Sequence, residues 1–365
     1  MNLSERLKSA RAAAGLTQKQ VSARCGIDDS SLSAFEHGQS EPRLGQLSSL
    51  AEVYHLSLSY FLDETEPQTQ LVLWRNQPDN QQEIQAEFLQ LCRQYRQLEI
   101  WTDQTNMKHL PQLDDGKGHC DYRRAENLAE ETRKQMGLGE QPGESLFWIL
   151  EEGYGVKIFH LDLGDCGTAA CAISEEFGEA ILLNSKCSPW RRNHDLAHEL
   201  FHLLTWKRFK HDEGICEPDQ QEEKYATCFA GNLLLPGGPV YKAISEGADN
   251  EGNIPFSKLD RIARQFHVSL ESLLWRMHLL FHWEESKTKE YVEIAQRYVK
   301  TVPRDHGPTP PLFPEGYRSL AIQALNSGDI SLGRFAKFMS ISRAAAEKFL
   351  SEGESEDAQV STALA

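Results

Sequence analysis

Apolar residues recur at three- and four-residue spacings over residues 3–62, in short segments joined by tight polar turns. This spacing is that of one face of a helix, so the pattern predicts roughly four or five short helices. It ends at residues 63–70 (DETEPQTQ), where a proline and polar residues interrupt it. We therefore expect a small all-α domain over residues 1–67.

A longer amphipathic helix is predicted over residues 80–101. We assign residues 68–118 to a linker and this bridging helix, and residues 121–136 to a further helix that ends at Gly137. The apolar positions that define the bridging helix are Ile84, Phe88, Leu91, Tyr95 and Leu98.

The periodicity then changes. Residues 155–163 (GVKIFHLDL) and 170–184 (ACAISEEFGEAILLN) are rich in β-branched and aromatic residues and are interrupted at Gly178, which predicts strands of a small antiparallel sheet. Long helical patterns return from about residue 191. The sequence therefore predicts a mainly α protein with a small antiparallel β-sheet, in the α+β class.

The C-terminal part begins with a proline-dense segment, residues 301–316 (TVPRDHGPTPPLFPEG), which excludes regular helix and a central strand. Helical spacing returns over residues 317–349, and the last residues are small and acidic. We expect the main domain at 119–300, a linker and helical region at 301–350, and a disordered tail at 351–365.

The charge of the chain limits its partners. Its 365 residues carry 38 Lys and Arg against 54 Asp and Glu, a formal charge of −16, which excludes a broadly basic surface that coats nucleic acid. No apolar run approaches the roughly 18 residues that a membrane span needs, so we expect a cytoplasmic protein with no membrane partner. Eight cysteines form no C-x-x-C pair, which argues against a zinc ribbon or a disulfide framework.

The clearest chemical signal lies in residues 191–206 (RRNHDLAHELFHLLTW). His198 and His202 are four residues apart and project from one face of the predicted helix, so their imidazoles can share one metal ion. Glu199 is placed to take a proton from water at the open coordination position, as in the H-E-x-x-H helix of zinc hydrolases. Such short motifs also occur in helices that bind nothing. This helix is otherwise apolar, which favours a paired or metal-bound role for its polar groups.

A third protein ligand is expected from the next helical pattern, where Glu222 and Glu223 lie about one turn in. We favour Glu223, because Ala226 and Ala230 on its face are small enough to let two helices approach each other. Glu222 would point about 100° away. The donor set favours Zn²⁺, with Mn²⁺ as an alternative in the same site.

A competing register places His194 four residues before His198, so that HDLAH with Asp195 matches H-D-x-x-H. We rank it second, because the shorter aspartate would have to reach further.

The motifs AHELFH, E-x-x-A-x-x-F-A and LLLP, preceded by ILEEGYGVKI and ILLN, resemble the ImmA/IrrE family of metallopeptidases over residues 120–285. The resemblance implies a zincin-like peptidase domain. It also implies that His198, His202 and Glu223 are the zinc ligands and that Glu199 is the general base.

Two features near this motif stay open. A donor to the oxyanion is needed, and Tyr225, His194 and His211 are candidates that the sequence does not rank. Cys166 and Cys171 precede the histidine helix, and a thiolate at the open coordination position would silence the enzyme.

The N-terminal domain has the pattern of a helix-turn-helix. Thr17 begins a predicted capping box, Gly26 makes the turn, and a second helix starts at Asp28. Residues 15–42 (GLTQKQVSARCGIDDSSLSAFEHGQSEP) resemble the Cro/repressor (XRE) family, whose second helix enters the major groove of DNA. The resemblance implies that Gln18 contacts a DNA phosphate. It also implies that four residues face the major groove: Ser30, Ser31, Ala34 and His37.

Residues 1–67 hold six Lys and Arg against nine Asp and Glu, so DNA binding is expected to be weak and salt-sensitive. The same domain could instead bind protein, as a homodimer or by capture of a similar domain in a substrate. Residues 262–280 and 330–350 also resemble helix-turn-helix halves, for which we expect a packing role. The first of them recurs in the peptidase family that this chain resembles, so presentation of the substrate is its alternative role.

We therefore expect a zinc-dependent, site-specific endopeptidase positioned by its own helix-turn-helix domain. The resemblance implies limited cuts in a transcriptional repressor, often one with a helix-turn-helix, which release stress or mobile-element genes. The alternative is a DNA-binding regulator or antitoxin-like protein whose metal domain is only a sensor or a structural module. The presence of Glu199 argues against that alternative.

Overall fold

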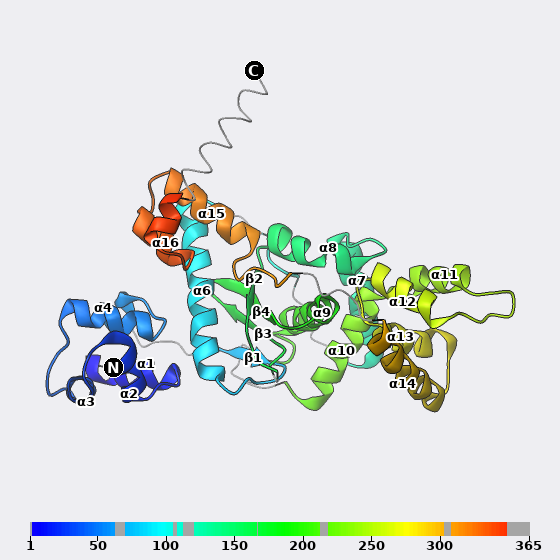
Figure 1. The fold of residues 1–365 in the computed structure, drawn as a ribbon, viewed down its shortest axis with the longest axis horizontal. Helices are drawn as coiled ribbons and strands as arrows, with labels where there is room; N and C mark the ends of the chain where they lie inside the picture. The colour runs from blue at the N-terminus through cyan, green and yellow to red at the C-terminus, as the bar shows by residue number, and fades with distance from the viewer. Residues whose placement is uncertain are drawn as a thin grey trace, which may run out of the picture.

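The computed structural model describes residues 2–62, 70–104, 108–111, 120–165, 167–211, 218–302 and 308–348. A small helical domain lies at one end, a sheet lies in the middle between helices, and a second group of helices forms the other end (Figure 1).

Five short helices form the N-terminal domain. Thr17 caps the second of them through the predicted capping box, and Gly26, at φ 71°, turns the chain toward the third. Apolar side chains such as Val21, Leu32 and Leu50 meet in one core. The helices are α1 (Leu3–Ala13), α2 (Gln18–Cys25), α3 (Asp29–Glu36), α4 (Leu44–Val53) and α5 (Leu58–Leu62).

Four strands form one sheet in the order β1-β3-β4-β2, and these are β1 (Val72–Trp74), β2 (Lys157–Leu161), β3 (Ala169–Ser174) and β4 (Gly178–Asn184). β3 pairs antiparallel with both β1 and β4, whereas β2 pairs parallel with β4. The mainly α class with a small sheet is confirmed, but the sheet is mixed rather than antiparallel throughout. The reason is the path of the chain. After β2 it skips one position in the sheet to form β3, and it then turns back to form β4 in the gap, so that β4 runs in the same direction as β2.

Side chains of the sheet alternate between two cores. On β4, Ala180 and Leu182 point into one core, and Ile181 and Leu183 point into the other. The first core contains α6 (Gln81–Trp101), α15 (Glu315–Asn326) and α16 (Leu332–Phe338). The second contains residues of α7 (Tyr122–Met136), α8 (Pro142–Trp148), the π-helical turn η1 (Ile149–Gly153), α9 (Pro189–Thr205), α10 (Gln220–Leu234), α11 (Gly237–Gly247), α12 (Phe256–Gln265), α13 (Leu270–Phe281) and α14 (Glu285–Thr301).

Helix α6 lies between the N-terminal domain and the sheet (Figure 1). Toward the N-terminal domain, Arg24 Nη2 lies 2.8 Å from Glu83 Oε1, and His55 Nδ1 lies 2.6 Å from Gln90 Oε1. The predicted buried stripe of this helix is confirmed. The segment that we assigned to a linker and a bridging helix therefore contains the strand β1 as well as the helix α6, and both pack into the body of the protein.

The C-terminal helices share the core of α6. The N–H of Gly316, at the start of α15, donates to Glu151 Oε1 at 3.0 Å, and Tyr317 stacks on Phe313 with ring centroids 4.9 Å apart. The tail over residues 351–365 lies outside the described residues. In the part of the chain that is described, every helix is too short or too polar to cross a membrane.

Candidate metal centre

Helix α9 carries the predicted metal motif through the centre of the protein. Pro189 stands at the start of the helix, where its missing N–H leaves no hydrogen bond unmade. The helix packs against the sheet, and His198, Glu199 and His202 are at most 1% exposed. Buried polar groups need partners, and most of these come from α10.

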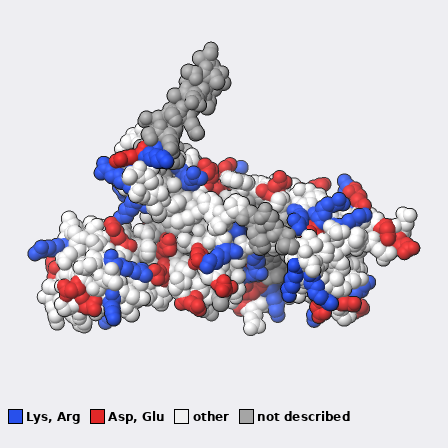
Figure 2. Space-filling view, in the orientation of Figure 1, with Lys and Arg blue, Asp and Glu red and all other residues white. Residues whose placement is uncertain are grey.

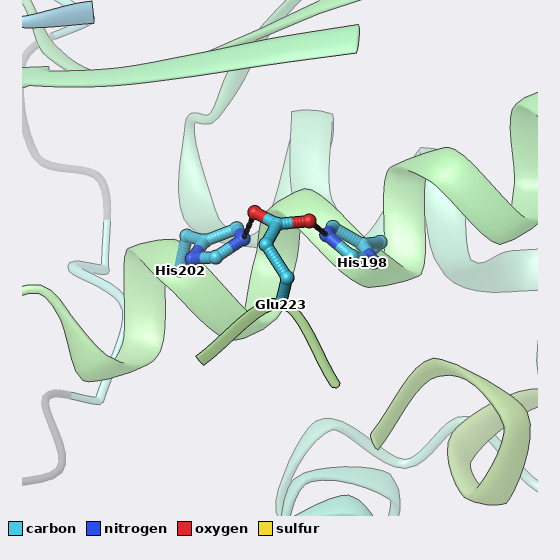
Figure 3. Close-up of side chains that lie close together, drawn as sticks. All are labelled: His198, His202 and Glu223. Atoms are coloured by element: carbon cyan, nitrogen blue, oxygen red, sulfur yellow. Dashed lines mark hydrogen bonds and ion pairs between the residues drawn. The ribbon is translucent and has the colours of Figure 1, made fainter. Parts of the chain in front are cut away.

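The carboxylate of Glu223 lies between the two imidazoles (Figure 3). Its Oε2 is 3.1 Å from Nε2 of His198, and its Oε1 is 3.3 Å from Nε2 of His202. The ligand atoms of these three side chains all lie within 4.8 Å of one another. The structure thus brings together the three residues that the sequence marks as metal ligands.

Glu222 has a role that the sequence analysis missed. Its Oε1 lies 2.8 Å from Nδ1 of His202 and 3.0 Å from Nε2 of His211. Because an ionised carboxylate only accepts hydrogen bonds, Glu222 keeps a proton on Nδ1 of His202 and directs Nε2 toward Glu223. The two ring nitrogens of His202 lie on opposite sides, so adjacent glutamates can contact both. In the sequence, the two adjacent glutamates that follow the histidine motif were the signal that could have indicated this second contact.

The electrostatics of this cluster favour positive charge. Burial alone would lower the pKa of His202, but hydrogen bonds to Glu222 and Glu223 outweigh it and raise the pKa to about 10. Burial lowers the pKa of His198 to about 3. Burial would raise the pKa of Glu223, yet its hydrogen bonds to both histidines lower it. The two carboxylates thus favour a positive charge at Nε2 of His202. A divalent cation held there would take the place of the Nε2 proton, because an imidazole nitrogen binds a metal only when it is deprotonated.

Glu199 faces β3 rather than α10. Burial raises its pKa to about 7, partly offset by the charge of His202. Its Oε1 has no hydrogen-bond partner within the described residues, which is expected where a water or an ion belongs. The residues present therefore fit a bound metal ion.

The thiol of Cys171 is hydrogen-bonded to Glu199. Burial and the charge of Glu199 raise its pKa well above the usual range, so the proposed thiolate switch is disfavoured at this cysteine. Cys166, the other candidate, lies outside the described residues.

The competing register has little support, because Asp195 is engaged elsewhere. Arg75 forms a short ion pair with its carboxylate, and Nε of Arg191 donates to it at 3.1 Å. Asp195 is also fully buried. A carboxylate held by two guanidinium groups is poorly placed to serve as a base.

The three candidates for the oxyanion donor differ in position. Tyr225 packs edge-on against Tyr122, with centroids 5.4 Å apart. His211 contacts Glu222 on the side of His202 that faces away from Glu223. Of the three candidates, His194 alone lines the cavity between α10 and α13 that Glu223 also lines.

The residues expected to face DNA lie on α2, on α3 and at the C-terminal end of α3, and some contact neighbours within the domain. Gln18 donates through Nε2 to Glu36 at 2.9 Å, and His37 donates through Nδ1 to the carbonyl of Ser33 at 2.7 Å. Ala34 is half-buried and His37 is exposed. The contact by Gln18 leaves less of its side chain for a phosphate.

Asp28 is the N-cap of α3. Its carboxylate accepts hydrogen bonds from the hydroxyls of Ser30 and Ser31 and from the amide of Ser31. Acidic and basic side chains are interspersed over the visible face of the N-terminal domain (Figure 2). This distribution agrees with the weak electrostatic affinity expected from composition.

Comparison with known sequences gives two family matches. Residues 7–61 match the helix-turn-helix family HTH_3, and residues 151–278 match the IrrE N-terminal-like domain, Peptidase_M78. The HTH-type transcriptional regulator ImmR of Bacillus subtilis (strain 168) is 36% identical over 66 residues, which are 18% of this chain. The match spans 52% of that regulator, about half its length.

Solved structures are more distant. A Mycobacterium tuberculosis transcriptional regulator is 16% identical, with a TM-score of 0.31 over 52% of this chain and 51% of that one. PlcR from Bacillus thuringiensis, solved with the peptide PapR7 and DNA, is 13% identical, with a TM-score of 0.17 over 82% of this chain and 95% of that one. Both scores are too low to support a shared fold.

The two family matches cover the segments in which the sequence motifs were found, and the HTH_3 match falls on the helices α1 to α5. This chain therefore carries an XRE-type helix-turn-helix domain followed by an IrrE N-terminal-like domain of the peptidase family M78.

Proposed function

We propose that this chain is a zinc-dependent endopeptidase that cuts a transcriptional repressor at a specific site and is positioned by its own helix-turn-helix domain. One observation carries the proposal: the ligand atoms of His198, His202 and Glu223 lie within 4.8 Å of one another, and Glu199, which follows His198 on α9, has a buried oxygen with no hydrogen-bond partner among the described residues. Two histidines and a carboxylate form catalytic zinc sites, and Mn²⁺ is the alternative ion.

A bound metal supplies Lewis-acid chemistry, polarising the substrate carbonyl and making water more acidic. Glu199 accepts the proton of the attacking water and passes it to the leaving amine. Its position beside His198 on α9 and its contact with Cys171 on β3 hold the carboxyl in place. Burial of this carboxyl keeps bulk water from competing for it.

Glu199→Gln is expected to retain its metal and to cleave at least about 100-fold more slowly, because an amide cannot accept the proton. His202→Ala is expected to lose the metal, since one of three protein ligands is removed. Metal content is measured by mass spectrometry, and cleavage is measured on repressors encoded by neighbouring genes. Casein is the control, because a site-specific enzyme leaves it intact.

Wild-type cleavage by zinc-loaded Glu199→Gln would contradict the peptidase mechanism. A zinc content in His202→Ala equal to wild type would contradict the ligand set. Stoichiometric zinc with no cut in any candidate repressor would favour the alternative, a DNA-binding regulator or antitoxin-like protein whose metal domain is a sensor or structural module.

Glu222 is proposed to fix the orientation of His202 toward the metal. Glu222→Ala is expected to weaken zinc affinity about 10- to 100-fold, because outer carboxylates orient histidine ligands and raise their basicity. Glu222→Gln keeps an acceptor oxygen and is the matched control, with a smaller loss. Competition with a zinc-binding dye measures both affinities. Equal affinity of Glu222→Ala and wild type would remove this role.

His194 is our candidate for the oxyanion donor. Nη1 of Arg75 lies 3.5 Å from its Nδ1, and a guanidinium only donates, so we assign the ring proton to Nε2. Burial and the charge of Arg75 lower the pKa of His194 to about 3, which keeps the ring neutral. Because His194 lines the cavity that Glu223 also lines, we propose that its Nε2–H, on the side of the ring away from Arg75, is the donor to the oxyanion.

His194→Ala is expected to lower kcat about 100- to 1,000-fold at unchanged zinc content, as removal of an oxyanion donor does. His194→Gln, whose amide also donates, is expected to recover part of the loss. Steady-state kinetics on the repressor substrate measure both variants. An unchanged kcat for His194→Ala would show that His194 is not the oxyanion donor.

The helix-turn-helix domain is proposed to place the peptidase near its substrate. A domain that binds the DNA occupied by the repressor raises the local concentration of that repressor without tight binding of the repressor itself. The HTH_3 match over residues 7–61 and the 66-residue similarity to an HTH-type transcriptional regulator support DNA as the partner. The alternative is that the helix-turn-helix domain binds a similar domain in another protein instead of DNA.

His37→Glu is expected to weaken binding to duplexes selected from a random pool about tenfold, with the effect shrinking as salt rises, because the new charge repels phosphates. Fluorescence anisotropy measures the affinity. Asn250→Glu, an equal charge change at an exposed turn before α12, is the matched control. Equal losses in both variants, or no loss in either, would count against α3 as the DNA-facing helix.

A further inference from the structure

A cavity of about 610 Å³ opens beside the candidate metal centre, and the chemistry described above uses only its lining residues His194 and Glu223. Helix α10 forms one wall, α13 forms the other, and α7 contributes Tyr122 and Glu126. Glu223 and His194 also line it. Cavities of a few hundred cubic ångströms commonly hold ligands. Its position next to the candidate reaction centre makes it a candidate for binding part of the substrate.

The cavity presents apolar surface to solvent. Tyr122 and Leu279 are 50% and 49% exposed, although both are large hydrophobic side chains. Trp275 also lines the cavity. It lies on α13, between Ser272 and Leu279 in the sequence, and both of these residues line the same wall. Apolar surface in water is unfavourable unless a ligand covers it, so a hydrophobic occupant fits this wall.

The charges around the cavity balance each other. Its lining contains the basic residues Lys224 and Arg276 and the acidic residues Glu126 and Glu223. Arg276 is held by a hydrogen bond from its Nε to the carbonyl of Leu235 at 2.9 Å. A lining of this kind does not select a charged side chain, which again favours an apolar one.

The length of the cavity indicates how much of a substrate it can hold. Glu223, Thr227 and Gly231 line it and follow one another on one face of α10. Eight residues of helix span about 12 Å, which is the length of roughly three to four residues of extended peptide. The cavity therefore extends beyond the position of a single residue.

We propose that this cavity binds the substrate next to the scissile bond, as an extended segment of about three residues with a large apolar side chain. Trp275 and Leu279 are then the residues that determine specificity. The proposal rests on the proposed peptidase function and adds the class of substrate that the site accepts.

Gly231 allows a test that leaves the cavity wall intact. A Cβ at this position would meet no atom within 4 Å, so a side chain can begin there without a clash. Because Gly231 lines the cavity, we expect the rest of a larger side chain to enter it. Gly231→Leu is expected to fold and to fill the cavity near Thr227. Gly231→Ala makes the same gain in helix propensity but adds only a methyl group, and is the matched control.

The experiment uses the zinc-loaded full chain and two pairs of metal-binding probes. L-Phenylalanine hydroxamate is compared with glycine hydroxamate, and 2-benzylsuccinyl hydroxamate with succinyl hydroxamate, by isothermal titration calorimetry. The pairs place a benzyl group on opposite sides of the metal. In wild type and Gly231→Ala, one benzyl probe is expected to bind about tenfold or more tightly than its unsubstituted partner. In Gly231→Leu and Trp275→Ala, this ratio is expected to fall to near one.

Two outcomes would overturn the inference while leaving the proposed function in place. One is equal binding of both probes of each pair to wild type, and the other is a ratio that survives in Gly231→Leu. If neither unsubstituted hydroxamate binds the zinc-loaded protein, the metal centre itself is wrong and the inference falls with it. The first two outcomes are thus distinguishable from a failure of the proposed function.

Discussion

The burial of two histidines and a glutamate in an apolar helix is the constraint on which the rest of the structure depends. His198, Glu199 and His202 are almost completely inaccessible to water, so their hydrogen bonds must come from protein groups or a bound ion. Helix α10 supplies partners for the two histidines through its adjacent glutamates, and its fully buried Ala226 and Ala230 allow the close approach. The packing of α9 on α10 and the assembly of the candidate site are therefore one interaction.

The same constraint reaches beyond the segment that matches the IrrE N-terminal-like domain, residues 151–278. Arg75 follows β1, which pairs with β3, and its guanidinium reaches Asp195 and His194 on α9. Without this arginine, Asp195 would be a buried charge paired with Arg191 alone. Helix α6 follows β1 and contacts the N-terminal domain. The segment between the two matched regions thus completes the surroundings of the candidate site.

The sequence predicted the features that depend on local spacing. The four-residue interval of His198 and His202 and the buried stripe of α6 follow from helix geometry, and the structure has both. Features that depend on contacts between distant segments were missed. β1 has only three residues, too few for a strand pattern, and the parallel pairing of β2 depends on the path of the chain. The role of Glu222 was missed although the paired glutamates pointed to it, because a helical wheel places only one of two adjacent residues toward His202 and does not show that this ring is hydrogen-bonded on both sides.

The helix-turn-helix likeness of residues 262–280 has a physical basis that links the two regions of the chain. Gly26 and His267 both have positive φ, and each is followed by a buried apolar residue and a capping residue before the next helix. Aligned on this turn, the positions of α3 expected to face DNA at Ser31, Ala34 and His37 correspond to three α13 residues that line the cavity, Ser272, Trp275 and His278. The local turn fixes which face of the second helix is left outside the core. On α3 this face carries Ser31, Ala34 and His37, which suits the proposed contact with DNA. On α13 the large apolar ring of Trp275 takes the place of Ala34, which suits the proposed contact with a substrate.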